Sequence, residues 1–133
     1  MFASVVIPTY NRKPILEKCL LALEHQQLAG ALDCFEVVVV DDGSTDGTPD
    51  WLREHAARFP HVRLIEQEHG GPAAGRNRGV QQANGDVIVF IDSDLVVTDT
   101  FLACHARALS HHWQTHGDRL AFKIGRASCR ERV

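Results

Sequence analysis

The chain has 133 residues, of which 44% are hydrophobic and 23% are charged, and its formal net charge is −3. This composition predicts one folded domain with a buried core and argues against an intrinsically disordered chain. No basic stripe precedes the last ten residues, so we expect no nucleic acid as a partner.

Targeting signals are not evident in the sequence. No apolar run approaches the roughly 20 residues that a membrane-spanning helix needs. The first residues, MFASVVIPTYNR, have neither the basic region nor the cleavage site of a signal peptide. The four cysteines show no CxxC spacing, which favours reduced thiols. We therefore expect a cytoplasmic protein.

Hydrophobic periodicity predicts strands and helices that alternate along the chain. Short runs rich in Val and Ile predict strands at residues 3–8, 35–40, 61–66 and 86–91. Apolar residues at helical spacing predict helices from Pro14 to about Gln27, from Asp46 to about Phe59, over 73–83, and from Thr98 or Asp99 to about His112. Apolar strands alternating with helices predict the α/β class, as a parallel-sheet α/β/α sandwich.

Polar residues follow each predicted strand. Right-handed crossovers place the carboxyl ends of all strands at one edge of the sheet, which is where such sheets bind ligands. The residues that follow the strands are Pro8-Thr9-Tyr10, Asp41-Asp42, His69-Gly70-Gly71 with Arg76 in the next helix, and Asp92-Ser93-Asp94. We therefore expect one polar site at this edge.

Asp92 and Asp94 are candidate cation ligands. If the strand geometry persists, both carboxylates face one side within about 7 Å. Two charges at that distance repel by about 2 kcal/mol at an effective dielectric constant of about 20. Solvent, protonation of one member, or Mg²⁺ or Mn²⁺ would relieve the repulsion. Solvated turn aspartates are the alternative, but the position after a buried strand favours the cation.

Asp41, Asp42 and Arg76 suggest recognition of a nucleotide. A carboxylate after the second strand can accept a hydrogen bond from a heterocycle's N–H, although an Asx turn would explain the same residues. Arg76 lies one turn into a helix, where a guanidinium is well placed to bind a phosphate. An exposed helical arginine is the simpler interpretation of Arg76 alone.

The last residues, 123–133, differ from the rest of the chain. They are rich in arginine and show neither helical nor strand periodicity. Their back-translation fits a common short-read sequencing adapter. Our hypothesis is that this segment is not native and that the natural sequence departs from this one near Phe122. A basic tail that binds an acidic partner is the alternative.

Four segments, SVVIPTYNR, VVVVDDGSTDGT, GGPAAGRNRGV and GDVIVFIDSDL, occur in this order between Ser4 and Leu95. Together they resemble the nucleotide-sugar-binding half of a family 2 glycosyltransferase with the GT-A fold. The resemblance implies a Rossmann-like GT-A domain over residues 1–122 that lacks its C-terminal part. It also implies an inverting transfer of a sugar from a nucleotide-diphosphate donor, with a UDP-sugar favoured, to an unknown saccharide or lipid-linked acceptor.

The resemblance also implies roles for individual residues. Asp42 would accept a hydrogen bond from the base, Arg76 would lie near the base and diphosphate, and Asp92 would lie by the ribose. Asp94 would bind Mn²⁺ or Mg²⁺, which stabilises the departing diphosphate as a Lewis acid. The residues implied to bind the nucleotide are Pro8, Thr9, Tyr10, Asp41, Asp42, Arg76, Asp92 and Ser93.

The catalytic base of such enzymes comes from a later segment, together with most acceptor contacts. We therefore assign no base, and we expect weak, metal-dependent nucleotide binding without efficient transfer. A missing C-terminal part would be the only route to a membrane, at whose inner face the full-length protein would then act.

Two other functions remain open at this stage. A nucleotidyltransferase shares the sheet and the metal chemistry, but it favours a glycine-rich basic loop after the first strand, where this chain has PTYNR. A non-catalytic α/β module with a solvated acidic edge is the second.

Overall fold

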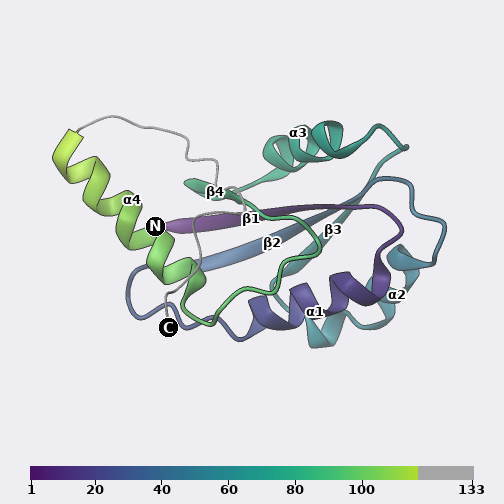
Figure 1. Cartoon of the computed structure of the whole chain (residues 1–133), viewed down its shortest axis with the longest axis horizontal. Coiled ribbons are helices and arrows are strands. Elements are labelled where there is room, and N and C mark those ends of the chain that lie inside the picture. The colour runs from purple at the N-terminus through teal and green to yellow at the C-terminus, as the bar shows by residue number, and fades with distance from the viewer. Residues whose placement is uncertain (117–133) are drawn as a thin grey trace.

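In a computed structural model, which describes residues 1–116, four parallel strands form one sheet in the order β3-β2-β1-β4 (Figure 1). The strands are β1 (Phe2–Thr9), β2 (Cys34–Asp41), β3 (Val62–Glu66) and β4 (Val87–Phe90). The helices are α1 (Lys13–Glu24), α2 (Thr48–Glu54), the 3₁₀ helix η1 (Ala56–Arg58), α3 (Pro72–Gln82) and α4 (Phe101–His116). The predicted α/β fold with a parallel sheet is confirmed.

The strand register brings the carboxyl ends of the strands together. Thr9 at the end of β1 lies opposite Asp41 at the end of β2, and Asp41 lies opposite Glu66 at the end of β3. On the other side of β1, Val6 pairs with Phe90, the last residue of β4. The segments that follow the strands therefore leave the sheet at one edge, called the carboxyl edge below, and the opposite edge is called the amino edge.

Helices cover both faces of the sheet (Figure 1). The odd-numbered apolar residues of β1 and β2 are buried in a large core that they share with α1, α2 and α4. The even-numbered valines Val6, Val38 and Val40 form a smaller core on the other face, where α3 lies. This arrangement is the predicted α/β/α sandwich, with the thinner layer made by α3 alone.

Glycines let α3 lie close to the sheet. A Cβ atom on Gly79 would stand 2.2 Å from Cγ1 of Val6, and one on Gly75 would stand 3.0 Å from Cβ of Pro8. Both glycines are buried. The glycine face of α3 therefore sets the distance between this helix and β1. Because Arg76 is on the same helix, that distance also sets the position of Arg76 relative to the carboxyl edge.

A polar network holds the far end of α3. Glu36 of β2 accepts hydrogen bonds from Ser4 (2.7 Å), from the Asn84 backbone (2.8 Å) and from Arg63 (3.2 Å), and Arg63 also donates to the Gln82 carbonyl. Burial alone would raise the pKa of the Glu36 carboxyl, but these donors outweigh it and the pKa is lowered. The carboxylate thus ties the end of α3 to the sheet.

The strand boundaries agree with the prediction to within one residue, but the helix boundaries differ more. Helix α1 ends at Glu24 rather than near Gln27. Contacts with a distant segment replace the last helical turn. The Gln26 side chain donates to the Thr98 carbonyl, and the Gln27 backbone donates to the Asp99 carbonyl.

The predicted second helix is interrupted after Glu54. Nδ1 of His55 lies 2.8 Å from the Trp51 carbonyl, and η1 then carries the chain to buried Phe59. Asp46 was expected as the cap, but the cap residue is Gly47. The Asp46 carboxylate still accepts from the Thr48 backbone, at 3.1 Å. Helix α4 starts later than expected, at Phe101, and extends past His112 to His116.

Residues 117–133 are outside the described part of the chain. The proposed non-native segment 123–133 therefore stays a hypothesis. Within residues 1–116, no helix combines the length and apolar character that spanning a membrane requires.

Candidate functional site

The predicted site residues gather at the carboxyl edge. Asp42 follows β2 directly, and its backbone donates to the Thr9 carbonyl at the end of β1 (2.9 Å). Arg76 reaches from α3 to Asp92, with Nη2 2.9 Å from Oδ1. Segments after β1, β2 and β4 and the start of α3 therefore meet in one region, as the parallel topology predicts.

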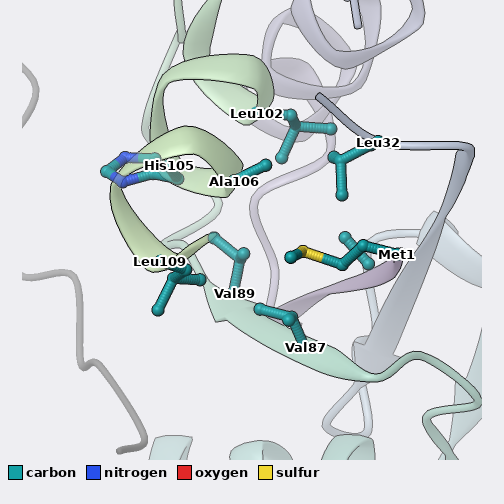
Figure 2. Close-up of a pocket in the computed structure, with 9 residues that line it drawn as sticks. Met1, Leu32, Val87, Val89, Leu102, His105, Ala106 and Leu109 are labelled. Carbon is teal, nitrogen blue, oxygen red and sulfur yellow. The ribbon is translucent and has the colours of Figure 1, made fainter. Parts of the chain in front are cut away.

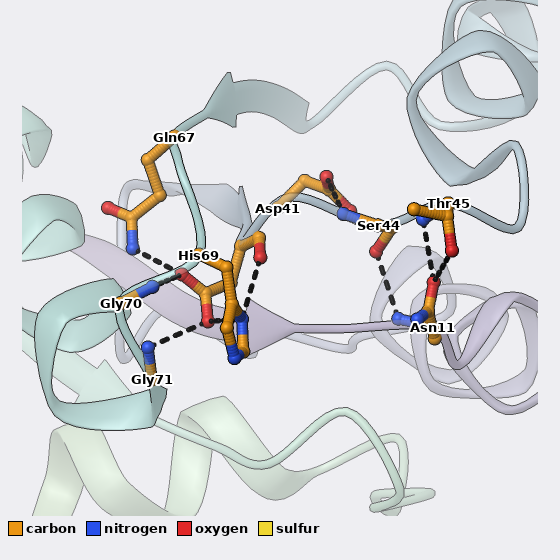
Figure 3. A network of polar contacts seen from close by, with 9 residues as sticks. Asn11, Asp41, Ser44, Thr45, Gln67, His69, Gly70 and Gly71 are labelled. Carbon is orange, nitrogen blue, oxygen red and sulfur yellow. Dashed lines mark hydrogen bonds and ion pairs between the residues drawn. The ribbon is translucent and has the colours of Figure 1, made fainter.

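Asp42 is the most tightly held carboxylate of this edge. Its side chain is 4% exposed. Oδ1 accepts from Gln67 Nε2 (2.8 Å) and the Gly70 backbone (2.8 Å), and Oδ2 accepts from the Gly71 backbone (2.9 Å). Nδ1 of His69 lies 3.0 Å from Oδ2 (Figure 3). The loop between β3 and α3 thus wraps around this one carboxylate.

Those donors keep Asp42 ionised. Burial raises the pKa of the Asp42 carboxyl, but the hydrogen bonds from Gln67, Gly70 and Gly71 and the nearby His69 lower it more, so the net shift is downward. A negative charge therefore stays at the base of the site at neutral pH.

Asp41 has a different environment. Its Oδ2 accepts from the Ser44 backbone (3.0 Å), which closes an Asx turn after β2 (Figure 3). Its Oδ1 is buried and, like Oγ1 of the adjacent Thr9, has no hydrogen-bond partner among residues 1–116. Buried polar atoms normally have a partner. The two atoms thus mark a place where water or a ligand group completes the structure.

Gly43 allows the chain to turn sharply behind Asp42. Its φ is +80°, in the left-handed region, and a Cβ there would meet the His69 backbone nitrogen at 3.1 Å. The backbone of His69 is therefore packed against the turn, while its side chain projects outward and is 58% exposed. The ring stacks on Tyr10, with centroids 4.3 Å apart.

The Asp92-Ser93-Asp94 segment corrects one step of the sequence argument. Strand β4 ends at Phe90, and the Leu95 backbone donates to the Asp92 carbonyl (3.1 Å), so the segment is a turn and not a continued strand. Strand alternation therefore does not determine where the two carboxylates point. Each one instead faces an arginine: Asp92 pairs with Arg76, and Asp94 lies 3.8 Å from Arg12.

Helix α1 supports this turn from below. Cys19 is fully buried, and its Sγ lies 4.0 Å from the Asp92 carbonyl. Burial first, and the charge of Asp94 second, raise the pKa of the Cys19 thiol to about 12. A neutral thiol thus lies under the acidic turn, and Ser93 within the turn is buried.

Three residues of the site received no role from the sequence. Arg12 lies near Asp94, and Gln67 and His69 both contact Asp42. Arg12 and His69 both follow a predicted strand at the carboxyl edge, and this position was the available signal. Which carboxylate each one meets depends on how the loops fold back, and no local pattern encodes that.

The acidic turn fits a cation that completes its coordination with a ligand. Among residues 1–116, no three His, Cys, Asp or Glu residues come together as a metal cage. Mg²⁺ is usually bound by one or two carboxylates, with substrate phosphates and water filling the remaining positions. The carboxylates of Asp92 and Asp94 provide that kind of donor set, and Arg12 and Arg76 beside them suit the phosphates.

A hollow lies at the amino edge and differs in character from this site. Met1, Leu32 and Val87 line it together with Leu102 and Leu109 of α4 (Figure 2). Among residues 1–116, His105 is the one polar side chain that lines it, and burial lowers the pKa of that imidazole. The hollow is an apolar seam between α4 and the sheet, and its described lining residues offer no charged group for a phosphate or a cation.

Comparison with known proteins identifies the family. The sequence profile of the family described as Glycosyl transferase family 2 matches residues 4–131. The glycosyltransferase YfnE of Bacillus subtilis is 41% identical over 108 residues, which cover 81% of this chain and 27% of YfnE. The poly(ribitol-phosphate) beta-glucosyltransferase of Bacillus spizizenii is 38% identical over 96 residues, 71% of this chain and 15% of that protein. The chain thus spans about a quarter or less of these two relatives.

Solved structures show the same fold. TarS 1–349 of S. aureus, crystallised with UDP, has a TM-score of 0.71 and 32% identity over 84% of this chain and 33% of its own. A mannosyltransferase from Pyrobaculum calidifontis, in complex with GDP-Man and Mn²⁺, has a TM-score of 0.66 and 34% identity over 76% of this chain and 30% of its own. The chain has the GT-A fold and belongs to glycosyl transferase family 2.

Proposed function

We propose that this chain is the donor-binding part of an inverting glycosyltransferase that takes its sugar from a nucleoside diphosphate, with a UDP-sugar as the donor. The observation that carries the proposal is the convergence of Tyr10, Asp42, Arg76, Asp92 and Asp94 at one edge of a family 2 fold. Complexes of TarS with UDP and with UDP-GlcNAc support the nucleotide class.

The base-binding end of the site is proposed to lie at the ends of β1 and β2. Tyr10 is 42% exposed and offers a ring face, and the Asp42 carboxylate beside it is ionised and can accept from an imide N–H. Pro8 and Thr9 form the adjoining wall. Asp41 holds the turn through Ser44 and leaves Oδ1 for a further partner.

The diphosphate end is proposed to lie between α3 and the acidic turn. Arg76 neutralises Asp92 and retains further N–H donors for a phosphate, since a guanidinium has five. Asp92 and Ser93 are assigned to the ribose side. Arg12 is 52% exposed next to Asp94 and adds a second positive charge at the same end.

Asp94 is proposed to hold Mn²⁺ or Mg²⁺. A cation bound there supplies Lewis-acid stabilisation of the charge that develops on the departing diphosphate. The residues of this chain contribute by orientation: the buried Cys19 and Ser93 fix the turn, and Arg76 holds Asp92 in place. The Mn²⁺ in the mannosyltransferase complex supports this assignment.

The acceptor side is proposed only as a class. A saccharide or a lipid-linked saccharide would supply the attacking hydroxyl, and a carboxylate base would remove its proton. No residue among 1–116 is assigned as that base. A cytoplasmic location, at the inner face of the membrane in a full-length protein, is part of the same proposal.

Calorimetric titration of the purified chain with UDP tests the proposal. UDP should bind in the presence of Mn²⁺ and bind much more weakly without it. Asp94→Ala should weaken the affinity for UDP in the presence of Mn²⁺ by at least about tenfold, because the substitution removes a carboxylate ligand of the cation. Asp50→Ala is the matched control, since the exposed Asp50 carboxylate on α2 pairs with Arg53 rather than with a residue of the proposed site.

Two outcomes would contradict the proposal. The first is that UDP, GDP and dTDP all fail to bind with or without Mn²⁺. The second is that binding occurs but depends neither on Mn²⁺ nor on Asp94. A preference for GDP or dTDP over UDP would overturn the choice of base alone and would leave the donor-binding function intact.

A further inference from the structure

His69 makes two contacts with the proposed base-binding end. Its imidazole stacks on the ring of Tyr10, with centroids 4.3 Å apart and 30° between the planes. Its Nδ1 lies 3.0 Å from Oδ2 of Asp42 and 3.2 Å from the Asp42 carbonyl oxygen. One flat ring thus has a stacking partner on its face and an anionic partner at its edge.

The direction of the hydrogen bond follows from the partner. An ionised carboxylate and a carbonyl oxygen can only accept, so Nδ1 of His69 carries a proton and donates it. The two Asp42 oxygens have about four acceptor positions between them. Gln67, Gly70 and Gly71 donate to three of them, and Nδ1 of His69 lies 3.0 Å from Oδ2. A further donor to Oδ2 therefore has to take the place that the His69 ring holds.

A bound nucleobase would make the same two kinds of contact. It is a flat heterocycle that stacks on an aromatic face, and the imide of uracil donates an N–H to a carboxylate. We propose that the His69 side chain occupies the place of the nucleobase in the ligand-free protein, so that donor binding has to displace it. This inference rests on the proposed function, which assigns Tyr10 and Asp42 to the base.

His69 is the partner of Asp42 that can move most easily. The donors from Gly70 and Gly71 are backbone amides at the start of α3. The Gln67 side chain is half-buried, whereas that of His69 is 58% exposed. The His69 backbone nitrogen is packed against Gly43. Rotation of the His69 side chain about its own bonds therefore frees both Tyr10 and Oδ2 of Asp42 without unfolding the loop.

Affinity for UDP distinguishes a competitor from a supporting residue. If His69 competes with the base, His69→Ala should bind UDP in the presence of Mn²⁺ about fivefold more tightly, because a stack and a hydrogen bond no longer have to be broken. His25→Ala serves as the control, since His25 is exposed at the end of α1 and outside the site. That variant should match the unsubstituted chain.

Nuclear magnetic resonance gives a second readout on the unsubstituted chain. The ring protons of His69 and Tyr10 should show a nuclear Overhauser effect without ligand, and saturating UDP with Mg²⁺ in place of the paramagnetic Mn²⁺ should abolish it. This measurement needs no substitution, so a folding defect in a variant cannot obscure it.

The outcomes separate the two claims. Binding of UDP with equal or lower affinity by His69→Ala, or a His69–Tyr10 contact that persists in the complex, would overturn the displacement while the donor-binding function stands. Failure of UDP, GDP and dTDP alike to bind either protein would overturn the proposed function and the displacement together. Tighter binding by His69→Ala, with loss of the ring contact on adding UDP to the unsubstituted chain, supports both.

Discussion

The carboxylate of Asp42 accepts hydrogen bonds from Gln67, Gly70 and Gly71, all of which belong to the loop between β3 and α3 or its junction with α3. The sequence places Asp42 after a buried strand and predicts an acceptor there. It does not predict that Gln67, Gly70 and Gly71, which lie 25, 28 and 29 positions away, surround that carboxylate. These partners depend on the path of the loop between β3 and α3. Sequence reasoning therefore found the acidic residue but not the donors that surround its carboxylate. It also did not find the proposed competition between His69 and the nucleobase.

The contacts of Asp42 lead to a prediction about stability. Asp42→Asn should lower the free energy of unfolding by about 1–3 kcal/mol near pH 7, because an amide cannot accept from Gln67, Gly70 and Gly71 at both positions and a buried N–H group loses its partner. Urea unfolding of both proteins measures the difference. Asp50→Asn, at an exposed position of α2, should change the free energy by less than about 0.5 kcal/mol.

The same comparison has a pH dependence with a defined sign. The pKa of Asp42 is lowered in the folded protein. Its contribution is therefore present above the ordinary aspartate pKa, about 3.9, and is lost as the pH falls through the lower folded value. Asp46 and Glu36 also have lowered pKa values and will destabilise both proteins in acid. The gap between the two proteins should narrow below about pH 4, and a gap that widens there would contradict the assigned environment.

Elements were predicted unequally well, for a physical reason. Strands are short runs rich in β-branched residues, buried on both faces in β1 and β2 and half-buried in β3 and β4, so their sequence alone defines them to within one residue. Helix ends depend on partners elsewhere in the chain. Gln26 leaves α1 to contact Thr98, and His55 ends α2 by contacting the Trp51 carbonyl. The extent of a helix is thus set partly by tertiary contacts that no local pattern records.

Helix α3 provides a prediction at the scale of an element. Gly79→Ala places a Cβ atom 2.2 Å from Cγ1 of Val6, so the helix or the strand has to shift. The free energy of unfolding should fall by about 1–3 kcal/mol, and UDP should bind more weakly because α3 carries Arg76. Asn77→Ala, on the exposed side of the same helix, is the control and should be neutral or slightly stabilising.

A double variant tests whether the contact with Val6 is the cause. Val6→Ala removes the atoms that the new methyl group would meet. Gly79→Ala combined with Val6→Ala should therefore lose less stability than the sum of the two single losses. Strict additivity in chemical denaturation would mean that the close packing of α3 on β1 is not what the glycine provides.

At the scale of the whole molecule, the parallel topology of the sheet determines where the site lies. Parallel strands joined by crossovers end at a common edge, and the structure gathers Tyr10, Asp42, Arg76 and Asp94 there, as the sequence predicted. The apolar seam at the amino edge was not predicted, because it forms where α4 crosses the sheet, and the direction of a crossing helix is not visible in its periodicity.

The central claim is that the carboxyl edge binds a nucleoside diphosphate through a cation. Paramagnetic broadening by Mn²⁺ tests it most directly, because the effect falls steeply with distance and the eight residues of β1 separate the two edges by about 26 Å. With UDP present, Mn²⁺ should broaden the amide resonances of Thr9, Gly43 and Asp94 strongly, and those of Phe2 and Leu32 far less. Broadening centred on the amino edge, or spread evenly over the chain and unchanged by UDP, would contradict the account.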